Sequence, residues 1–260
     1  QREWFKRTLA ESKAKWKVWG ASGGTLDWRV DPQNLPPGMG NAWPSKSYGS
    51  FGGGDFGAAY SERGEIYDHI RREGITGFAT VSGDRHSFWA GYSAKSLPPE
   101  TFEPVGIAFI TGSISAPGLV ESWEHSFPKD HPLRPIHLAD RPGKDRPEAT
   151  INLTLHHGVR SAIEYAKTGD IAAARALRNP DVAPHLEFID MGGHGYAVVT
   201  AASDVFETEF VCIPRPIAPT EAADGGPIRY RVKHQAKLWH QGETPKLVQT
   251  ILEGDPKLSV

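Results

Sequence analysis

The chain has 260 residues, and its 29 Lys and Arg against 31 Asp and Glu give a formal net charge of −2. This balance gives no general attraction to nucleic acid or to an anionic membrane, and no apolar run has the length of a membrane-spanning helix. The single cysteine, Cys212, excludes an internal disulfide and a cysteine-based zinc site, while 28 Gly and 21 Pro favour a loop-rich fold over a helical bundle.

The chain opens directly on a helical pattern, with Phe5 and Leu9 one turn apart, which predicts a helix over residues 1–13. Because neither an initiator Met nor a leader precedes it, we expect the chain to be part of a longer polypeptide. The alternation in Lys15–Trp19 then predicts a short strand. The glycine-rich stretch Gly20–Gly24 resembles a phosphate cradle, but it lacks the Lys-Ser/Thr pair of a P-loop, so a strand-end turn is the favoured interpretation.

Residues 31–57 are dominated by Pro, Gly, Asn and Ser and predict a long loop. Four aromatic side chains in this stretch would be costly to leave in water. We therefore expect the loop to be packed at the rim of a cleft through Trp43, Tyr48, Phe51 and Phe56.

The stretch Ser61–Trp89 predicts a helix, a buried strand and a polar tip. The strand, Ile75–Val81, is apolar and β-branched, which is typical of a strand covered on both faces. Polarity then changes abruptly at Ser82–Ser87. In layered α/β proteins catalytic groups lie where strands end, so Asp84 and His86 are the principal candidates for chemistry.

The remaining chain alternates between apolar and loop-forming segments. A second buried strand is predicted at 103–112, and the charged, Pro-rich segment 124–149, with His125, His131 and His137, is interpreted as a surface excursion. Further predictions are helices over 159–166 and 170–177, an antiparallel meander over 186–213, and a weak helix at 246–252.

A carboxylate and an imidazole one residue apart suit a hard or borderline metal, which would activate water for attack on a phosphoryl group. Alternatively, Arg85 and His86 stabilise phosphoryl oxygens directly. The simplest alternative is that Asp84 caps a turn and His86 is an ordinary loop histidine. Because two ligands cannot complete a metal site, the first interpretation requires ligands from outside this chain.

The run Val81–Ala90 (VSGDRHSFWA) resembles the G-D-x-H-x-x-W block of PhoD-type alkaline phosphatases, which are metallophosphoesterases. In matching order, Trp16–Gly20 resembles the W-x-V-x-G strand of that family and Thr111–Gly118 resembles its G-T-S-I-S-S-P-G block. Looser similarities lie in Asp55–Tyr60 and in the segment from Asn179 to Tyr196.

The resemblance implies an α/β fold, a four-layer α/β/β/α sandwich of metallophosphoesterase type, of which this chain supplies roughly the carboxyl-terminal half. The amino-terminal half would be a separate or missing chain. Residues 1–224 would belong to the catalytic domain and residues 225–260 would form an extension that serves as a lid. Asp84 and His86 would be catalytic and would hold metal, iron and calcium in this family, and Arg85 would contact substrate.

The resemblance further implies hydrolysis of phosphate monoesters, and of diesters in some members, by metal-activated water with an alkaline optimum. It implies a periplasmic or secreted location. Two alternatives stay open: a phosphodiesterase or phospholipase D-like enzyme of the same superfamily, and a non-catalytic fragment or binding module without a complete metal cluster.

Overall fold

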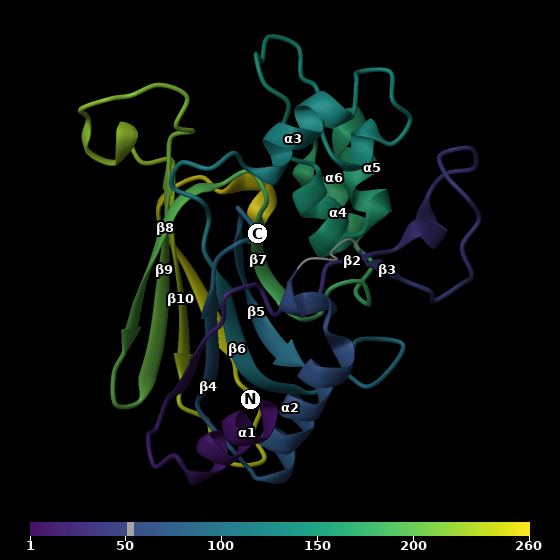
Figure 1. Cartoon of the computed structure of the whole chain (residues 1–260). Coiled ribbons are helices and arrows are strands. Elements are labelled where there is room, and N and C mark those ends of the chain that lie inside the picture. Colours follow the sequence, from purple (N-terminus) through teal and green to yellow (C-terminus); the bar gives the residue numbers. More distant parts are fainter. Residues whose placement is uncertain (51–54) are drawn as a thin grey trace.

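The computed structural model describes residues 1–50 and 55–260, which form three layers (Figure 1). A five-stranded sheet lies in the middle, with helices on one face and a four-stranded sheet on the other. The mixed α/β class expected from the sequence is confirmed. The described residues supply no second helical layer outside the four-stranded sheet, whose outer face carries ion pairs such as Arg231–Glu209 at 2.6 Å.

The five-stranded sheet has the order β1-β4-β6-β5-β7. Strands β1, β4 and β6 run parallel, and β5 runs antiparallel to both β6 and β7. The carboxyl ends of β1, β4, β6 and β7 therefore share one edge of the sheet. The bounds are β1 Lys17–Gly20, β4 Phe78–Ser82, β6 Pro104–Ile110, β5 Phe88–Ala94 and β7 Leu186–Asp190.

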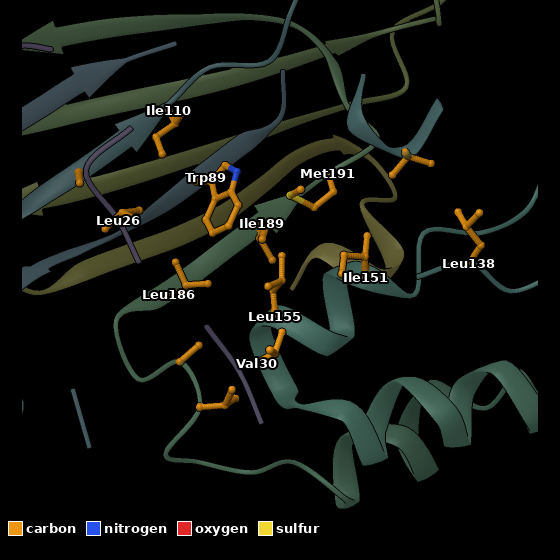
Figure 2. Packing of buried hydrophobic residues seen from close by; sticks show 14 residues of the cluster. Leu26, Val30, Trp89, Ile110, Leu138, Ile151, Leu155, Leu186, Ile189 and Met191 are labelled. Carbon is orange, nitrogen blue, oxygen red and sulfur yellow. The ribbon is translucent and has the colours of Figure 1, made fainter. Parts of the chain in front are cut away.

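Both faces of this sheet are covered at its centre, which explains why β5 and β6 are buried along almost their whole length, whereas the edge strand β1 alternates between half-buried and exposed residues. On the helical face, Trp89 and Ile110 pack with Ile151, Leu155 and Ile189 in one cluster (Figure 2). Rings from β5, β6 and β7 meet rings of the second sheet on the other face. The edge where β1, β4, β6 and β7 end is therefore fixed by packing on both faces of the sheet.

Two groups of helices cover the outer face of the five-stranded sheet (Figure 1). The first is α1 (Arg2–Glu11) with α2 (Tyr60–Arg72), which pack Leu9 and Ile70 on Phe78. The second group surrounds the upper end of β7 and comprises α3 Leu119–Ser126, α4 Ile151–His157, α5 Val159–Thr168 and α6 Ile171–Ala176. None of the helices in the described part of the chain is long and apolar enough to cross a membrane.

The second sheet has the order β11-β10-β9-β8 and is antiparallel throughout. Burial alternates along β9 and β10, as expected for a sheet with one face in the core. Its bounds are β8 His194–Ala201, β9 Val205–Ile213, β10 Tyr230–Lys237 and β11 Leu247–Gly254. The short elements elsewhere are β2 Arg29–Val30, β3 Gly49–Ser50, and the 3-10 turns η1 Pro32–Asn34, η2 Phe56–Ala58, η3 Arg134–Ile136, η4 Ala223–Gly225 and η5 Lys257–Ser259.

Several predicted elements are confirmed and others are wrong. The helices at 1–13, 159–166 and 170–177, the helix that opens the stretch Ser61–Trp89, and the strands near 15–19 and 103–112 are present. The meander over 186–213 is wrong at its first turn, because β7 joins the first sheet and β8 the second. Strand β5 was not predicted, since its buried residues follow directly on the polar tip.

The carboxyl-terminal tail is more structured than the sequence indicated. The helix expected at 246–252 is wrong: these residues fall in β11, which pairs with β10. Because β10 lies between β9 and β11, the segment after residue 225 is an integral part of the second sheet. The lid role assigned to residues 225–260 stays a prediction.

Two loop predictions are correct only in part. Within 124–149, His125 is exposed, but His137 is 2% exposed and belongs to a buried segment, so the description of the whole stretch as a surface excursion is wrong. In the 31–57 loop, Phe56 packs on Trp19 with ring centroids 4.9 Å apart, while Trp43 remains 43% exposed. Phe51 lies outside the described residues.

Candidate functional site

Three loops meet where β1, β4 and β6 end. Residues 21–28 follow β1, residues 83–87 follow β4, and residues 111–118 follow β6. The amide of Thr111 donates to the carbonyl of Ser82 at 2.9 Å, which ties the second loop to the third. The candidate residues 84–86 therefore lie at the tip of the middle of three parallel strands, where a layered α/β protein places its ligands.

The exposure, backbone conformation and contacts of Asp84 indicate that its side chain does not stabilise the fold. It is exposed, and its backbone is left-handed with φ 72°, a conformation that costs of order 1–3 kcal/mol in a residue other than Gly. Its carboxylate has no hydrogen-bond or ion-pair partner among the described residues. A Cβ added to Gly23 would lie 3.7 Å from Asp84 Oδ2, so the carboxylate lies over the first loop.

His86 is oriented by the third loop. Its backbone is also left-handed, with φ 50°, and its Nδ1 lies 2.6 Å from the carbonyl oxygen of Pro117. Because a carbonyl can only accept, Nδ1 carries the proton in the neutral ring and Nε2 carries the lone pair. A backbone carbonyl that holds one ring nitrogen in this way is the usual support of a histidine that binds metal or accepts a proton through the other.

Arg85 points in the opposite sense from its two neighbours, into the protein. Its side chain is 1% exposed, and Nε donates to Asp55 Oδ2 at 2.5 Å. A second nitrogen donates to the carbonyl of Leu26. The guanidinium carbon lies 5.0 Å from the ring centroid of Trp28 and 4.7 Å from that of Trp89, so two indole faces enclose it. Burial lowers the pKa of this guanidinium, and Asp55 opposes that effect.

The glycines around Arg85 are explained by its size. A Cβ on Gly24 would lie 2.3 Å from Arg85 Nε, and one on Gly57 would lie 2.4 Å from a terminal nitrogen of Arg85. The glycine-rich stretch after β1 therefore makes room for a buried guanidinium. This is consistent with the strand-end turn favoured from the sequence over a phosphate cradle.

Glu121, a partly buried residue at the rim of the third loop, was not among the predicted site residues. Its Oε1 lies 2.8 Å from Nε2 of His194, which begins the second sheet, and it also pairs with Arg215. Its Oε2 accepts the amide of Gly118 at 3.0 Å. This carboxylate thus fixes the residue next to Pro117. The only signal in the sequence is the spacing of Glu121 three residues after Gly118, which is typical of a helix start.

A cavity of about 680 Å³ lies beyond Glu121, between α3, the end of β7 and the carboxyl-terminal segment. Its lining includes Arg215, Asp190 and Tyr230, but neither Asp84 nor His86. We place the candidate site at the three loops rather than in this cavity, because the unpaired carboxylate and the oriented imidazole are found there.

The donor types of Asp84 and His86 suit a metal, but their number does not. Across residues 1–50 and 55–260, no group of three or more His, Cys, Asp or Glu side chains is placed to hold one. An iron and calcium cluster therefore does not fit the described residues of this chain by themselves.

The family model of the PhoD-like phosphatases matches residues 1–144. The chain belongs to the PhoD-like phosphatase family. The resemblance carried by Gly83–Trp89 and Gly112–Gly118 is thereby confirmed, and all three loops of the candidate site fall within the matched range. The looser similarities after residue 144 lie outside it.

One solved structure, titled "Structure of PhoD", matches 98% of this chain with a TM-score of 0.56 and 14% sequence identity. At this identity the match shows a shared fold. It covers 34% of that solved chain, so the present chain spans about a third of its length. A search of curated proteins found no match.

Proposed function

We propose that this chain forms part of the active site of a phosphate ester hydrolase, with Asp84 and His86 at its reacting edge. Membership of the PhoD-like phosphatase family supports the reaction class. The single observation that carries the residue assignment is the carboxylate of Asp84, which lies on a left-handed backbone and has no partner within residues 1–50 and 55–260. A structural aspartate would be expected to bond a helix terminus or a cation.

In this proposal, Asp84 contributes negative charge and His86 contributes the lone pair of Nε2. We propose that both are donors to a metal site, iron and calcium by resemblance, whose remaining ligands come from elsewhere. Arg85, expected from the sequence to touch substrate, is enclosed by Asp55 and two indoles, so its burial favours a role in holding the loop.

The finer features implied by the resemblance are part of the same proposal. They are a preference for monoesters, an alkaline optimum, a periplasmic or secreted location, and a four-layer sandwich completed by an amino-terminal half. The described residues provide three layers, and the uncovered outer face of the four-stranded sheet is the place available for a fourth.

The test is the turnover of a phosphate monoester and a phosphate diester by the wild-type chain and by Asp84→Asn, with iron and calcium supplied. The Asn side chain has the same shape and tolerates the left-handed conformation. Loss of about 10²-fold or more in kcat is expected for a group that stabilises charge in the transition state. Asp224→Asn is a matched control, because Asp224 is also exposed and left-handed, with φ 54°.

Equal turnover by Asp84→Asn and wild type would contradict the assignment. Faster diester than monoester turnover, lost in the same variant, would support the phosphodiesterase alternative. A wild-type chain that gains activity only when the amino-terminal half of a PhoD-like phosphatase is added would support the two-part site.

A further inference from the structure

Arg85 anchors the loop of residues 83–87, which follows β4, to the interior of the protein. It is flanked by two left-handed residues, Asp84 and His86, whose side chains lie against different loops. Because a left-handed residue stands on each side of the buried Arg85, the position of the Arg85 side chain determines where Asp84 and His86 lie. Each left-handed residue also costs energy, which the surroundings must offset.

The four attachments of Arg85 come from three separate segments. Asp55 precedes η2, the Leu26 carbonyl and Trp28 belong to the first loop, and Trp89 belongs to β5. We call Asp55, Arg85, Trp28 and Trp89 the Arg85 cluster. A charged group enclosed in this way is stable only while its partner remains, because an unpaired buried charge is strongly unfavourable.

The main chain of Arg85 has a second attachment of its own. Ser87 Oγ donates to the Arg85 carbonyl at 2.8 Å, and Ser87 Oγ in turn accepts the indole N–H of Trp89 at 2.7 Å. Trp89 therefore holds both the guanidinium and the carbonyl of the same residue. Its own position is fixed, since it is fully buried in the cluster shown in Figure 2.

We propose that the Arg85 cluster is a positioning device, in which the Asp55–Arg85 ion pair sets the direction of Asp84 and the tautomer of His86. This inference rests on the proposed function for its catalytic meaning, although its structural content is independent of any reaction. Arg85 is then a positioning residue, which acts through its two neighbours without contact to substrate.

The expected effect of the Arg85 cluster is on the hydrogen bond and the tautomer of His86. The 2.6 Å hydrogen bond from His86 Nδ1 to the Pro117 carbonyl requires residues 83–87 to keep their position relative to the third loop. If the ion pair is broken, the loop loses its anchor and the two left-handed residues can relax. His86 then leaves the carbonyl, and the proton is no longer confined to Nδ1.

A second buried pair provides the matched control. Arg63 of α2 makes a two-point ion pair with Asp27, at 2.8 Å to each oxygen, and is 1% exposed like Arg85. It also donates to the carbonyls of Thr25 and Gly57, so it holds the same neighbourhood. Across the described residues it makes no hydrogen bond or ion pair with residues 83–87, although its charge repels that of Arg85. Loss of Arg63 should therefore cost stability without moving His86.

The test is ¹⁵N NMR of the histidine rings in the full chain, where protonated and bare ring nitrogens have distinct shifts. A His86→Gln sample identifies the signals of His86 among the 11 histidines. Wild type and Arg63→Met are expected to show His86 protonated at Nδ1. Arg85→Met and Asp55→Asn are expected to show loss of that form, with shifted amides at residues 83–87.

Arg85→Lys serves if the neutral variants fail to fold, because it keeps the charge and loses the bond to the Leu26 carbonyl. Retention of the Nδ1-protonated form in folded Asp55→Asn and Arg85→Lys would overturn the proposal. An equal change in Arg63→Met would also overturn it, because the effect would then follow from general loosening.

Turnover provides a readout that separates this inference from the proposed function. A misplacement of about 1 Å can cost about 10²-fold in rate, so kcat should fall by that order in Asp55→Asn with KM little changed. If Asp84→Asn retains full activity, the proposed function fails while the NMR result still decides the positioning role. If Asp55→Asn moves neither His86 nor kcat, the positioning role fails alone.

Discussion

Two buried arginines hold the segment after β1, and they differ in what else they hold. Arg63 projects from a regular helix and bonds both oxygens of Asp27 and two carbonyls. Arg85 projects from a strained loop and has one carboxylate bond, one carbonyl bond and two aromatic faces. Among the described residues each guanidinium leaves one buried nitrogen without a partner, Nε in Arg63 and a terminal nitrogen in Arg85, but Arg63 makes four hydrogen bonds and Arg85 makes two.

The difference separates a stabilising pair from a positioning pair. The guanidinium of Arg63, with four hydrogen bonds, fastens one loop to a regular helix. The guanidinium of Arg85, with two hydrogen bonds, is less favourable in isolation, because a buried donor without a partner costs about 1–3 kcal/mol. The fold retains it at the point where two neighbouring residues face the solvent at the end of a strand. Stability and position are therefore carried by different arginines.

The largest expected loss of stability follows from removing the charge partner of Arg63. Asp27→Ala leaves Arg63 buried without its charge partner, which should lower the free energy of unfolding by about 3–5 kcal/mol. Asp55→Ala should cost less, because Arg85 keeps its contacts with the faces of Trp28 and Trp89. Urea unfolding of both variants measures the difference. A larger loss in Asp55→Ala would reverse the assignment of roles.

A second prediction concerns acid, through the histidine behind Asp27. His185 is buried and donates from Nε2 to the Asp27 carbonyl at 3.1 Å, while its Nδ1 has no hydrogen-bond partner among the described residues. Burial lowers the pKa of His185 to about 4. Because the folded pKa lies below the unfolded value, folding favours the neutral ring, and stability is lost as pH falls from about 6.5 towards 4.

Replacing His185 with a residue that does not titrate should show how much of the acid sensitivity comes from the segment behind Asp27. At pH 4 the loss from one such histidine approaches 3 kcal/mol at about 1.4 kcal/mol for each pKa unit. His185→Gln, which keeps an N–H for the Asp27 carbonyl, should flatten part of the pH dependence of unfolding. His240→Gln is the control, because His240 is exposed. His156 and His234, whose pKa values burial also lowers, should keep some acid sensitivity in the variant. An unchanged profile in His185→Gln would contradict this account.

The sequence predicted the fold where local pattern and burial agree. Strand β6 was recognised because seven consecutive residues are suited to a sheet covered on both faces, and α5 because its apolar residues share one face. The turn after β7 was misassigned because a glycine-rich link between strands looks the same whether it closes a hairpin or crosses between sheets. Strand β10 has Arg, Lys and Gln at its outward positions, which concealed its alternating buried face.

The position of the candidate residues at the end of a strand was predicted from the sequence, but the contacts around them were not. Asp84 and His86 were placed correctly at the end of β4. That Arg85 points inward, towards an aspartate 30 residues earlier in the chain, depends on tertiary packing that no local pattern records. The same holds for Glu121, which meets His194 from a distance of 73 residues along the chain.

The smallest expected effect on stability is at the residue with the largest expected effect on turnover. Asp84 is exposed and has no hydrogen-bond or ion-pair partner in the part of the chain that the structure describes, so Asp84→Asn should change the free energy of unfolding by less than about 0.5 kcal/mol. Asp84→Gly should be neutral or stabilising by up to about 1 kcal/mol, because Gly adopts the left-handed backbone without strain. Thermal unfolding of both variants beside wild type measures this. A loss of 2 kcal/mol or more would mean that the carboxylate supports the fold, and the contrast between Asp84 and the two buried aspartates would disappear.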